Sequence, residues 1–362
     1  MFIGAFLRTS AQTFCRVCVI INKRRNSLLN YEIRPALATP SVSIMTSLDW
    51  RVDLLKKYGG GVLSFTAFQP GIELFSIRDA GWIAFERKWG QVIVLGDPVC
   101  HPLQYGHLLS AFLKQFQEAL FVQISPAVAL QLRLLGYYTT QMGHESNIDL
   151  TSWTLSGKKK QVIRTAVNKV KKDGITIVEK QADPVAENAL TKSWLSSRKC
   201  HDRQIRFLIR PMHVDYEVGV RRFFAYDGDT PVGFVFFDPV YKDGKVDGYV
   251  PNISRASLDF HQGIFYALMS EAMSTFKEEG VPNMHLGLMP LSLDNPAEEF
   301  ESKILRNGFK LTRKLCGRFY NFDGINFTKS RFRGTMVPTY TAHRNKIPAI
   351  HFLTMFKICN VL

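Results

Sequence analysis

The sequence predicts an α/β protein with a mixed sheet, because short apolar strands and amphipathic helices alternate along most of its 362 residues. The clearest signal is the segment 245–292, in which a strand, a helix and a second strand follow one another. Two strands joined through a helix are usually parallel, and ligands bind at the carboxyl ends of such strands. We therefore expect a candidate site at the carboxyl ends of these two strands. Its helix carries a core-facing stripe of apolar residues at spacings of three and four: Ile264, Phe265, Leu268, Met269, Ala272, Met273 and Phe276.

The two halves of the chain share a predicted order of helix, meander of strands, helix and strand, which is compatible with a duplicated fold although the sequence itself shows no repeat. The first half predicts a helix, a meander of three strands, a helix, a fourth strand and a short helix, at 49–58, 74–77, 81–86, 91–95, 105–119, 120–124 and 131–135. The second predicts a strand, a helix and a hairpin before the segment above, and a helix and a strand after it, at 175–179, 184–199, 222–226, 232–238, 297–305 and 318–322. A chain of this length fits two domains. We expect them at 45–150 and 151–345, followed by a tail at 346–362.

Residues 1–44 are set apart by composition. The first 31 residues are apolar and basic and contain no acid, which is typical of an organellar transit peptide. An upstream start codon, with Met45 opening the protein, explains the same pattern. Both readings stay open, and the fold prediction does not use this leader.

The formal charge of +15, from 46 basic and 31 acidic residues, favours anionic partners such as nucleic acid, an anionic membrane surface or phosphate-bearing substrates. A general solubility role for the charge is the alternative. No stretch offers the ~18 uninterrupted apolar residues of a membrane-spanning helix. The six cysteines are scattered, with one C-x-x-C and no second pair, so we expect free thiols and no zinc site. We expect a cytoplasmic protein, either soluble or peripheral at the inner membrane face, with organellar targeting by residues 1–31 as the alternative.

The stretch 157–174 differs from the rest. It predicts a helix with Ser156 as its N-cap and Gly174 as its stop. Apolar residues form one face, and the other face is crowded with cations that repel one another unless an anion lies alongside. A solvated helix face is the alternative. The cations are Lys158, Lys159, Lys160, Arg164, Lys169, Lys171 and Lys172.

A meander that leads into a strand–helix–strand crossover is the plan of the acetyltransferase-like (GNAT) fold. The motifs narrow this further, and jointly they resemble the phosphatidylglycerol lysyltransferase C-terminal domain family, the aminoacyl-lipid synthases. They follow the family's order between about residues 74 and 342, and the resemblance is strongest after Trp153. The matching stretches are LGDPV at 95–99, the basic helix at 157–174, HLGLMPLS at 285–292 and FYNFDGINFTKSRFRGTMVPTYTA at 319–342.

The resemblance implies tandem GNAT-like domains that move an amino acid from aminoacyl-tRNA to a lipid hydroxyl. No metal or redox cofactor is expected, because the aminoacyl ester is already activated. The chain departs from the family at Asn252, where an acid is usual, and at Ser330, where Glu is common. The membrane domain usual in the family is not recognisable here. The acceptor, phosphatidylglycerol-like or sterol, the amino acid and the oligomeric state are therefore left open.

The catalytic candidates lie around the end of the strand at 245–256. Arg255 can hold a phosphate or an oxyanion, or form a salt bridge with Asp247 or Asp259. Asn252 shares this corner. Asp259 can hold the substrate ammonium and His261 can carry a proton, although both can equally be helix-cap or surface residues.

The substrate-binding candidates lie further along the chain. Glu298 and Glu299 can bind an ammonium group or be ordinary first-turn helix acids. Lys329, Arg331 and Arg333 can meet a lipid head group or tRNA phosphates, or form a solvated tail. His285 is expected to be a buried, satisfied histidine. The basic helix is the tRNA-binding candidate, through Lys158, Lys159, Lys160, Arg164, Lys171 and Lys172.

Two other functions stay open. An acyl-CoA-dependent N-acyltransferase would need a glycine-rich loop that holds a pyrophosphate with backbone N–H groups. The stretch 255–263 has one glycine and an aspartate where phosphate would be repelled, which argues against CoA. A non-catalytic module that binds nucleic acid or an anionic membrane is the other alternative.

Overall fold

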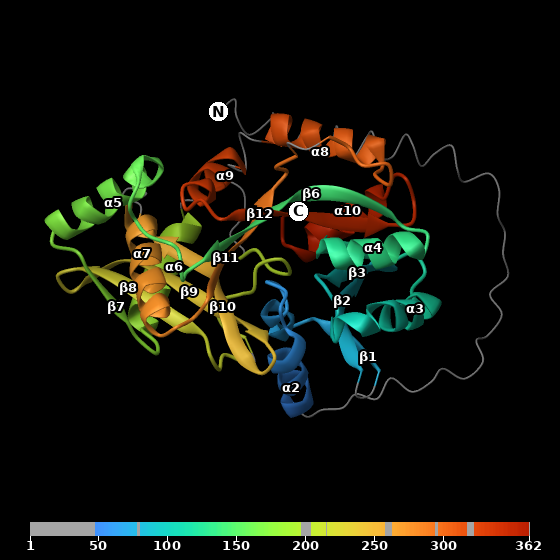
Figure 1. The fold of residues 1–362 in the computed structure, drawn as a ribbon, viewed down its shortest axis with the longest axis horizontal. Coiled ribbons are helices and arrows are strands. Elements are labelled where there is room, and N and C mark those ends of the chain that lie inside the picture. Colours follow the sequence, from blue (N-terminus) through green and yellow to red (C-terminus); the bar gives the residue numbers. More distant parts are fainter. Residues whose placement is uncertain are drawn as a thin grey trace. The chain divides into compact units, whose positions relative to one another are not determined.

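A mixed sheet runs through the described part of the computed structural model (Figure 1). The structure describes residues 48–77, 80–196, 204–214, 216–257, 263–293, 296–316 and 322–361. Within them the strand order is β1-β2-β3-β5-β12-β6-β11-β10-β9-β8-β7, with the short β4 (Val99–Cys100) paired to β2. The predicted mixed-sheet α/β class is confirmed. The leader at 1–44 lies outside the described residues.

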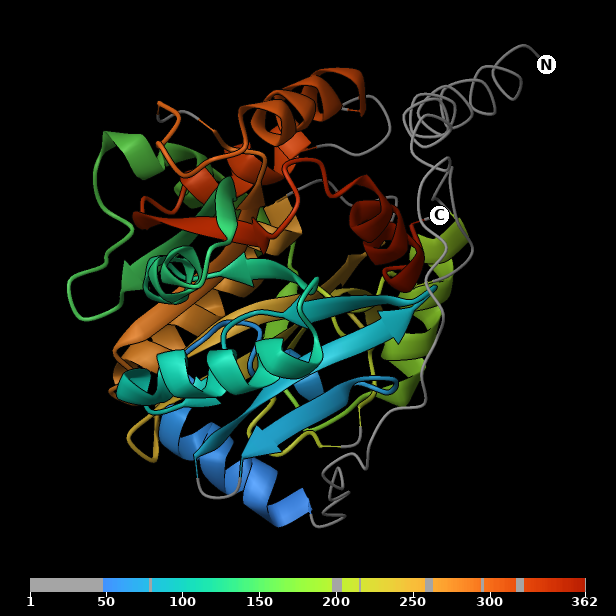
Figure 2. The same ribbon diagram turned by 90° about the vertical axis from the view of Figure 1, so that its right-hand side faces the viewer.

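The N-terminal half of the sheet is a three-stranded antiparallel meander followed by a parallel crossover. Residues of β2 alternate between the faces of the sheet. Ile83 and Phe85 face α3 and α4, while Trp82 and Ala84 face α10 (Ala349–Ile358). In Figure 2, α3 lies in front of β1 and β2. The elements are α2 (Leu48–Tyr58), β1 (Glu73–Ile77), β2 (Gly81–Lys88), β3 (Gln91–Leu95), α3 (Tyr105–Gln115), β5 (Leu120–Ile124) and α4 (Pro126–Leu134), with short 3-10 turns at Phe65–Phe68 and Pro102–Gln104.

The C-terminal half repeats this plan. Its strands form an antiparallel meander, and α7 carries the chain over to β11, which is parallel to β10. Tyr249 of β10 stacks on Phe276 of α7 with ring centroids 4.3 Å apart, which fixes the crossover helix on the sheet. The elements are α5 (Gln161–Lys172), β7 (Thr176–Glu179), α6 (Pro184–Ser196), β8 (Arg221–Asp227), β9 (Thr230–Lys242), β10 (Lys245–Ala256), α7 (Gly263–Glu278) and β11 (Asn283–Pro290).

Two strands join the halves. β6 (Tyr138–Asp149) pairs with β11 on one side, and β12 (Thr335–His343) lies between β6 and β5 on the other. The last strand of the chain therefore completes the N-terminal half. Residues Ser47–Leu362 form one compact unit, and the sheet is continuous across residue 150. Separate domains at 45–150 and 151–345 remain a prediction.

The C-terminal elements differ from the sequence prediction. The helix expected at 297–305 is wrong, because α8 spans Lys303–Cys316. Ser302 starts this helix: its hydroxyl accepts a hydrogen bond from the Leu305 N–H at 3.2 Å, which satisfies a free donor of the first turn. The expected strand at 318–322 falls largely outside the described residues, and α9 begins within it (Phe322–Ser330). The expected tail contains α10 (Ala349–Ile358), which packs on β3.

The basic helix also begins later than predicted. Gly157 has φ 94°, and a 3-10 turn at Lys158–Lys160 precedes α5. Ser156 is not the N-cap, because its hydroxyl bonds the Thr154 hydroxyl at 2.7 Å instead. The predicted stop at Gly174 is confirmed by its left-handed φ of 76° directly after the helix.

Breaking the buried ion pair between Arg210 and Asp238 is expected to destabilise the protein strongly. Arg210 and Asp238 are both fully buried, and the guanidinium lies 2.7 Å from the carboxylate. Arg210→Met is expected to cost about 3–5 kcal/mol in the free energy of unfolding, because it leaves a buried charge unpaired. Arg87→Met, which breaks an exposed pair with Glu73, is the control and is expected to cost about 1 kcal/mol or less. Urea unfolding of both variants measures the difference, and equal losses would contradict it.

Candidate functional site

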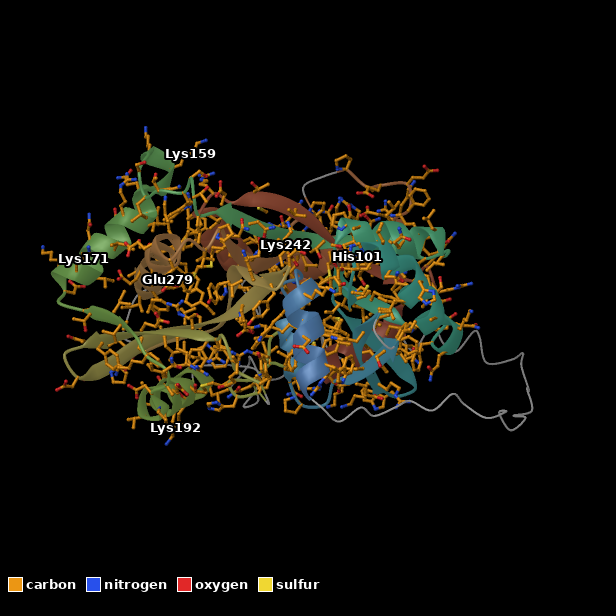
Figure 3. All side chains as sticks on the ribbon, turned by 60° about the horizontal axis from the view of Figure 1, so that its bottom comes forward. His101, Lys159, Lys171, Lys192, Lys242 and Glu279 are labelled. Atoms are coloured by element: carbon orange, nitrogen blue, oxygen red, sulfur yellow. The ribbon has the colours of Figure 1, made fainter. Side chains whose placement is uncertain are left out.

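Helix α5 rests its apolar face on the protein and exposes its lysines. Ile163 and Val170 are fully buried, in the same core as α7. Lys171 and Lys172 are exposed, and Lys159 and Lys171 project from opposite ends of this region in Figure 3. The fold therefore gives this helix a cationic outer face, as the sequence predicts.

Two of the predicted tRNA-binding cations hold the loop before α5. The Lys160 ammonium donates to the Thr154 carbonyl at 2.6 Å and lies 4.5 Å from the Trp153 ring centre. The Arg164 guanidinium donates to the carbonyls of Leu155 and Gly157. These bonds keep Lys160 and Arg164 at the loop, which leaves other cations to meet an anion.

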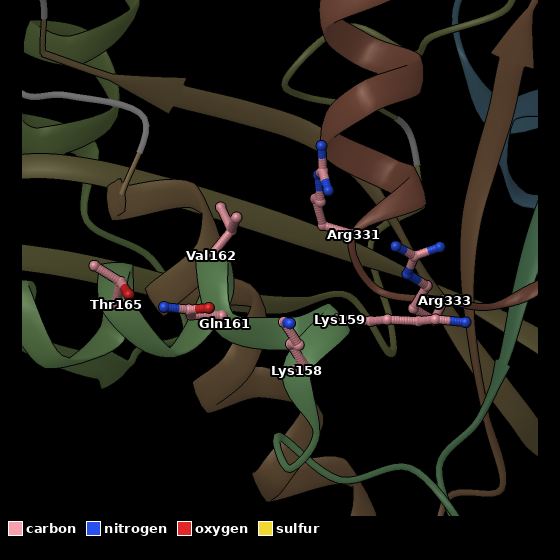
Figure 4. A pocket seen from close by; sticks show the side chains of 7 residues that line it. All are labelled: Lys158, Lys159, Gln161, Val162, Thr165, Arg331 and Arg333. Carbon is pink, nitrogen blue, oxygen red and sulfur yellow. The ribbon is translucent and has the colours of Figure 1, made fainter.

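Lys158 and Lys159 line a cavity of about 380 Å³ together with Arg331 and Arg333 (Figure 4). Gln161, Val162 and Thr165 complete its lining. The two pairs of cations come from segments far apart in the sequence. The structure thus brings residues predicted to bind tRNA together with residues predicted to bind a head group.

Phe332, the aromatic residue between Arg331 and Arg333, holds this segment in place. Phe332 is fully buried, and its carbonyl accepts a hydrogen bond from the Trp153 indole at 3.0 Å. The Arg331 guanidinium stacks on the Phe327 ring at 3.7 Å. This packing ties the residues after α9 to the loop before α5. The four cations therefore line one opening, a suitable environment for a phosphate.

A second group of ionisable side chains lies where the halves of the sheet meet. Asp97 follows β3, and its carboxylate accepts a hydrogen bond from the Ser125 N–H at 2.8 Å, just beyond the parallel strand β5. Gln123 of β5 donates its amide to the Glu145 carboxylate at 2.9 Å. Asp97 and Gln123 therefore occupy the carboxyl ends of two parallel strands, where ligands bind in open α/β sheets.

Lys329 approaches the same place from α9. Its ammonium donates to the Leu288 carbonyl of β11 at 2.7 Å. Leu288 lies directly opposite Glu145 in the β11–β6 register, and Val337 lies opposite Glu145 on β12. The register of β10 and β11 consists of the pairs Gly248–Asn283 and Tyr249–Met284. Lys329 thus reaches β11 beyond these two backbone pairs, close to Gly287 and to the Val250 side chain of β10.

The surroundings bring these groups into the neutral pH range. Burial raises the pKa of Asp97 to about 6 and the pKa of Glu145 to about 7. Burial lowers the pKa of Lys329 to about 8, partly offset by the negative charge of Glu145. All three residues are half-buried. A carboxyl and an ammonium that both exchange protons near neutral pH are suited to general acid–base chemistry.

The raised pKa of Glu145 predicts a pH dependence of stability. The folded protein keeps this proton at pH values where an unfolded glutamate, with a pKa near 4.5, has lost it. Wild-type stability is therefore lost as the pH rises from about 4.5 through 7. Glu145→Gln removes this loss, so the variant should gain stability relative to wild type between pH 5 and pH 8.

Urea unfolding at both pH values measures this gain. Glu279→Gln is the control, because hydrogen bonds from Arg221 lower the pKa of Glu279 and move its titration below this window. Its stability difference from wild type should not change. A Glu145→Gln difference that is the same at pH 5 and pH 8 would contradict the raised pKa.

Asn252 and Arg255, the two catalytic candidates at the end of β10, contact different parts of the structure. Asn252 donates to the Thr66 hydroxyl at 3.1 Å and accepts from the Arg210 N–H at 3.2 Å, which ties β10 to neighbouring segments. The Arg255 guanidinium stacks on the Trp194 ring of α6 at 3.7 Å. Catalytic roles for both remain predictions. Asp259 and His261 lie outside the described residues.

The other predicted residues also have defined surroundings. Glu298 pairs with Arg133 and accepts the Tyr340 hydroxyl at 2.6 Å; these bonds outweigh burial and lower its pKa. This glutamate therefore links α4 to β12, and Glu299 is exposed. His285 is buried as expected, and its Nδ1 bonds the Asn147 side chain at 3.0 Å. Its Nε2 is also buried but has no hydrogen-bond partner among the described residues and lies 4.0 Å from the Asp247 carboxylate, so the expectation of a fully satisfied histidine is wrong.

Sequence reasoning did not single out Asp97, Gln123 or Glu145. Asp97 stands in the LGDPV motif, and a polar residue directly after a predicted strand was a signal that could have found it. Gln123 and Glu145 had no local signal, because their meeting depends on the pairing of distant strands. No cluster of potential metal ligands occurs among the described residues. No helix within them is long and apolar enough to cross a membrane.

Solved structures share this arrangement. The structure of L-PGS from Bacillus licheniformis has a TM-score of 0.73 at 21% identity, covering 87% of this chain and 97% of that chain. The C-terminal domain (DUF2156) of a putative lysylphosphatidylglycerol synthetase from Agrobacterium fabrum has a TM-score of 0.72 at 19% identity, with the same coverage. The fold class is thus that of these synthetase domains, with two meander–crossover halves joined in one sheet.

The particular family follows from the sequence match. Residues 52–343 match the model described as "Phosphatidylglycerol lysyltransferase, C-terminal", and the chain belongs to this family. The resemblance noted in the sequence is confirmed. The phosphatidylglycerol lysyltransferase of Bacillus subtilis (strain 168) is 24% identical over 306 residues, 80% of this chain and 34% of the relative. The phosphatidylglycerol lysyltransferase of Staphylococcus aureus (strain MRSA252) is 22% identical over 328 residues, which cover 84% of this chain and 36% of the relative. The chain spans about a third of the length of these curated relatives.

Proposed function

We propose that this protein is an aminoacyltransferase that moves an amino acid from aminoacyl-tRNA to a lipid hydroxyl. The observation that carries the proposal is the placement of Lys329 at the junction of the two halves, where its ammonium bonds the carbonyl of Leu288, the residue opposite Glu145. Burial there brings the pKa of Glu145 to about 7 and the pKa of Lys329 to about 8. Family membership supports an aminoacyl-lipid product. The relatives are named for lysyl transfer to phosphatidylglycerol, and the acceptor class proposed here is a hydroxyl-bearing lipid of that kind.

The reaction is an ester exchange. The lipid hydroxyl oxygen bonds to the aminoacyl carbonyl carbon, and the bond from that carbon to the ribose oxygen breaks. The Glu145 carboxylate accepts the proton of the attacking hydroxyl, and the Lys329 ammonium gives a proton to the departing ribose oxygen. Both steps suit groups that titrate near neutral pH. Asp97 holds negative charge beside Glu145 and so raises the basicity of its carboxylate.

The cationic cavity supports a nucleic-acid donor. Lys158, Lys159, Arg331 and Arg333 surround one opening and offer charge to the phosphates of a tRNA acceptor end. The same chain segment carries Lys329 two residues before Arg331. The arginines proposed to bind phosphate and the lysine proposed to protonate the ribose oxygen thus belong to one short segment of the chain. The protein binds peripherally to an anionic membrane surface, where it binds the lipid acceptor.

The test is transfer with purified components. The protein is mixed with tRNA carrying radiolabelled amino acids and with phosphatidylglycerol in detergent micelles, and the lipid is extracted. Labelled lipid is expected, and treatment of the charged tRNA with RNase before mixing should abolish it. Label that persists after RNase would contradict the tRNA donor. Binding of tRNA without any labelled lipid would favour the non-catalytic binding module instead.

A further inference from the structure

Helix α8 carries a cationic and apolar surface that the proposed reaction does not use. Its sequence, KILRNGFKLTRKLC, contains five basic residues and no acidic one. The side chains of Ile304 and Leu311 are 56% and 53% exposed. Single exposed apolar side chains are common on protein surfaces, so it is the combination of these two residues with the lysines of the same helix that matters here.

The inner face of α8 is firmly anchored. The Arg306 guanidinium makes a buried ion pair with Glu301 at 2.7 Å. Phe309 packs edge-on against Phe352 of α10, with ring centroids 5.5 Å apart. These contacts fix the rotation of the helix about its own axis, so the outward residues are set by the fold.

A further contact ties α8 to the proposed reaction centre. The Arg313 guanidinium pairs with Asp323 of α9 at 2.7 Å and donates to the Leu291 carbonyl, just after β11. α9 also carries Lys329, which bonds Leu288 of β11. A surface that α8 docks against is therefore held close to the elements that carry Lys329.

The outer face has two adjacent stripes. Ile304, Gly308 and Leu311 follow the spacing of four and three that places residues on one side of a helix. The exposed Lys303, Lys310 and Lys314 follow spacings of seven and four and form the neighbouring stripe. Long lysine side chains beside an apolar stripe can reach past it toward charged head groups.

We infer that α8 is the surface by which this protein docks on a bilayer containing anionic phospholipid. Its apolar stripe enters the head-group boundary, and its lysines bind lipid phosphates. Charge complementarity selects this occupant, because a face with three exposed lysines and no acid matches an anionic lipid surface and repels a second copy of itself. The inference rests on the proposed function only for the identity of the lipid substrate.

Co-sedimentation of the full chain with vesicles tests the docking surface. The vesicles contain phosphatidylcholine alone or phosphatidylcholine mixed with phosphatidylglycerol. Wild type is expected to bind the mixed vesicles in a salt-dependent way. The double variant Ile304→Ser and Leu311→Ser should bind at least about tenfold more weakly, because the apolar stripe is removed. The triple variant Lys303→Gln, Lys310→Gln and Lys314→Gln should lose about tenfold or more, together with most of the salt dependence.

Matched controls exclude general effects of these changes. Leu103→Ser with Leu134→Ser removes two leucines that are 87% and 75% exposed elsewhere. Lys114→Gln, Lys192→Gln and Lys242→Gln removes three exposed lysines from α3, α6 and β9. Both controls should bind mixed vesicles like wild type. Transfer to phosphatidylglycerol dispersed in detergent should be unchanged in every variant of this set.

The possible outcomes separate this inference from the proposed function. Vesicle binding that is absent in wild type, or equal in the α8 variants and their controls, would overturn the docking surface. Detergent-phase transfer would then still decide the proposed function on its own. Light scattering adds one more outcome: if Ile304→Ser with Leu311→Ser turns a dimer into a monomer and leaves vesicle binding intact, the face joins two copies, and the inference is wrong.

Discussion

Lys329→Met is expected to lower the rate of aminoacyl transfer at least about 100-fold, the usual contribution of a positioned acid or base. The substitution removes the ammonium that lies against the Leu288 carbonyl and near the charge of Glu145. Methionine has a similar length and no charge, so the packing of α9 on β11 should survive. Transfer to phosphatidylglycerol in detergent measures the loss, and circular dichroism checks the fold. Lys314→Met, on the exposed face of α8, is the control and should keep full detergent-phase activity.

The pH dependence separates proton transfer from charge. Wild-type activity should rise as Glu145 loses its proton near pH 7 and fall as Lys329 loses its proton near pH 8. Lys329→Arg keeps a positive charge at every pH in this range. If Lys329 donates a proton, the arginine variant is nearly inactive throughout. If only its charge matters, the variant stays active, and its activity no longer falls near pH 8. Full activity with an unchanged bell-shaped pH dependence would contradict both roles.

Neutralising the cationic cavity is expected to weaken tRNA binding by a factor of about 100 to 1,000 near 0.1 M salt, since each phosphate that meets a cation releases bound counterions. The variant combines Lys158→Gln, Lys159→Gln, Arg331→Gln and Arg333→Gln, which line one opening of about 380 Å³. Glutamine keeps most of the side-chain length, so the packing of Phe332 on Trp153 should remain. The slope of log affinity against log salt should become shallower by about one for each phosphate that no longer has a cationic partner.

Filter binding across a range of salt concentrations measures both quantities. The control variant carries Lys114→Gln, Lys192→Gln, Lys242→Gln and Lys245→Gln, four exposed lysines away from the cavity, and has the same net charge. It should lose far less affinity and keep most of its salt slope. Equal losses in the two variants would mean that net charge, and not the cavity, attracts the tRNA.

The parts of the fold that were predictable have local causes. The apolar spacing of α7 and the apolar runs of β1 to β3 and β5 are visible in the sequence, and these elements lie close to where they were expected. β6 was not predicted, because its buried residues include Thr139, Thr140, Gln141 and Ser146, and their polar character hides the strand pattern. β12 contains Pro338, which usually argues against a central strand.

The candidate site divides in the same way. The basic residues of α5 and the segment after α9 were recognisable as charge in the sequence, but their meeting in one cavity depends on Trp153 packing on Phe332. Glu145 is an ordinary glutamate until β11 and β12 flank it and burial shifts its pKa. Such groups are chemically defined by tertiary structure, which single-sequence periodicity does not contain.

The position of β12 has a consequence for the order in which the protein can fold during synthesis. Domains usually fold as units from the N-terminus while the chain is being made. Here the strand between β5 and β6 is supplied by Thr335–His343, near the end of the chain. The growing chain therefore has two unpaired inner strand edges until Thr335–His343 has been translated. Premature termination before residue 335 would leave those edges exposed, and the shortened chain would be prone to aggregation.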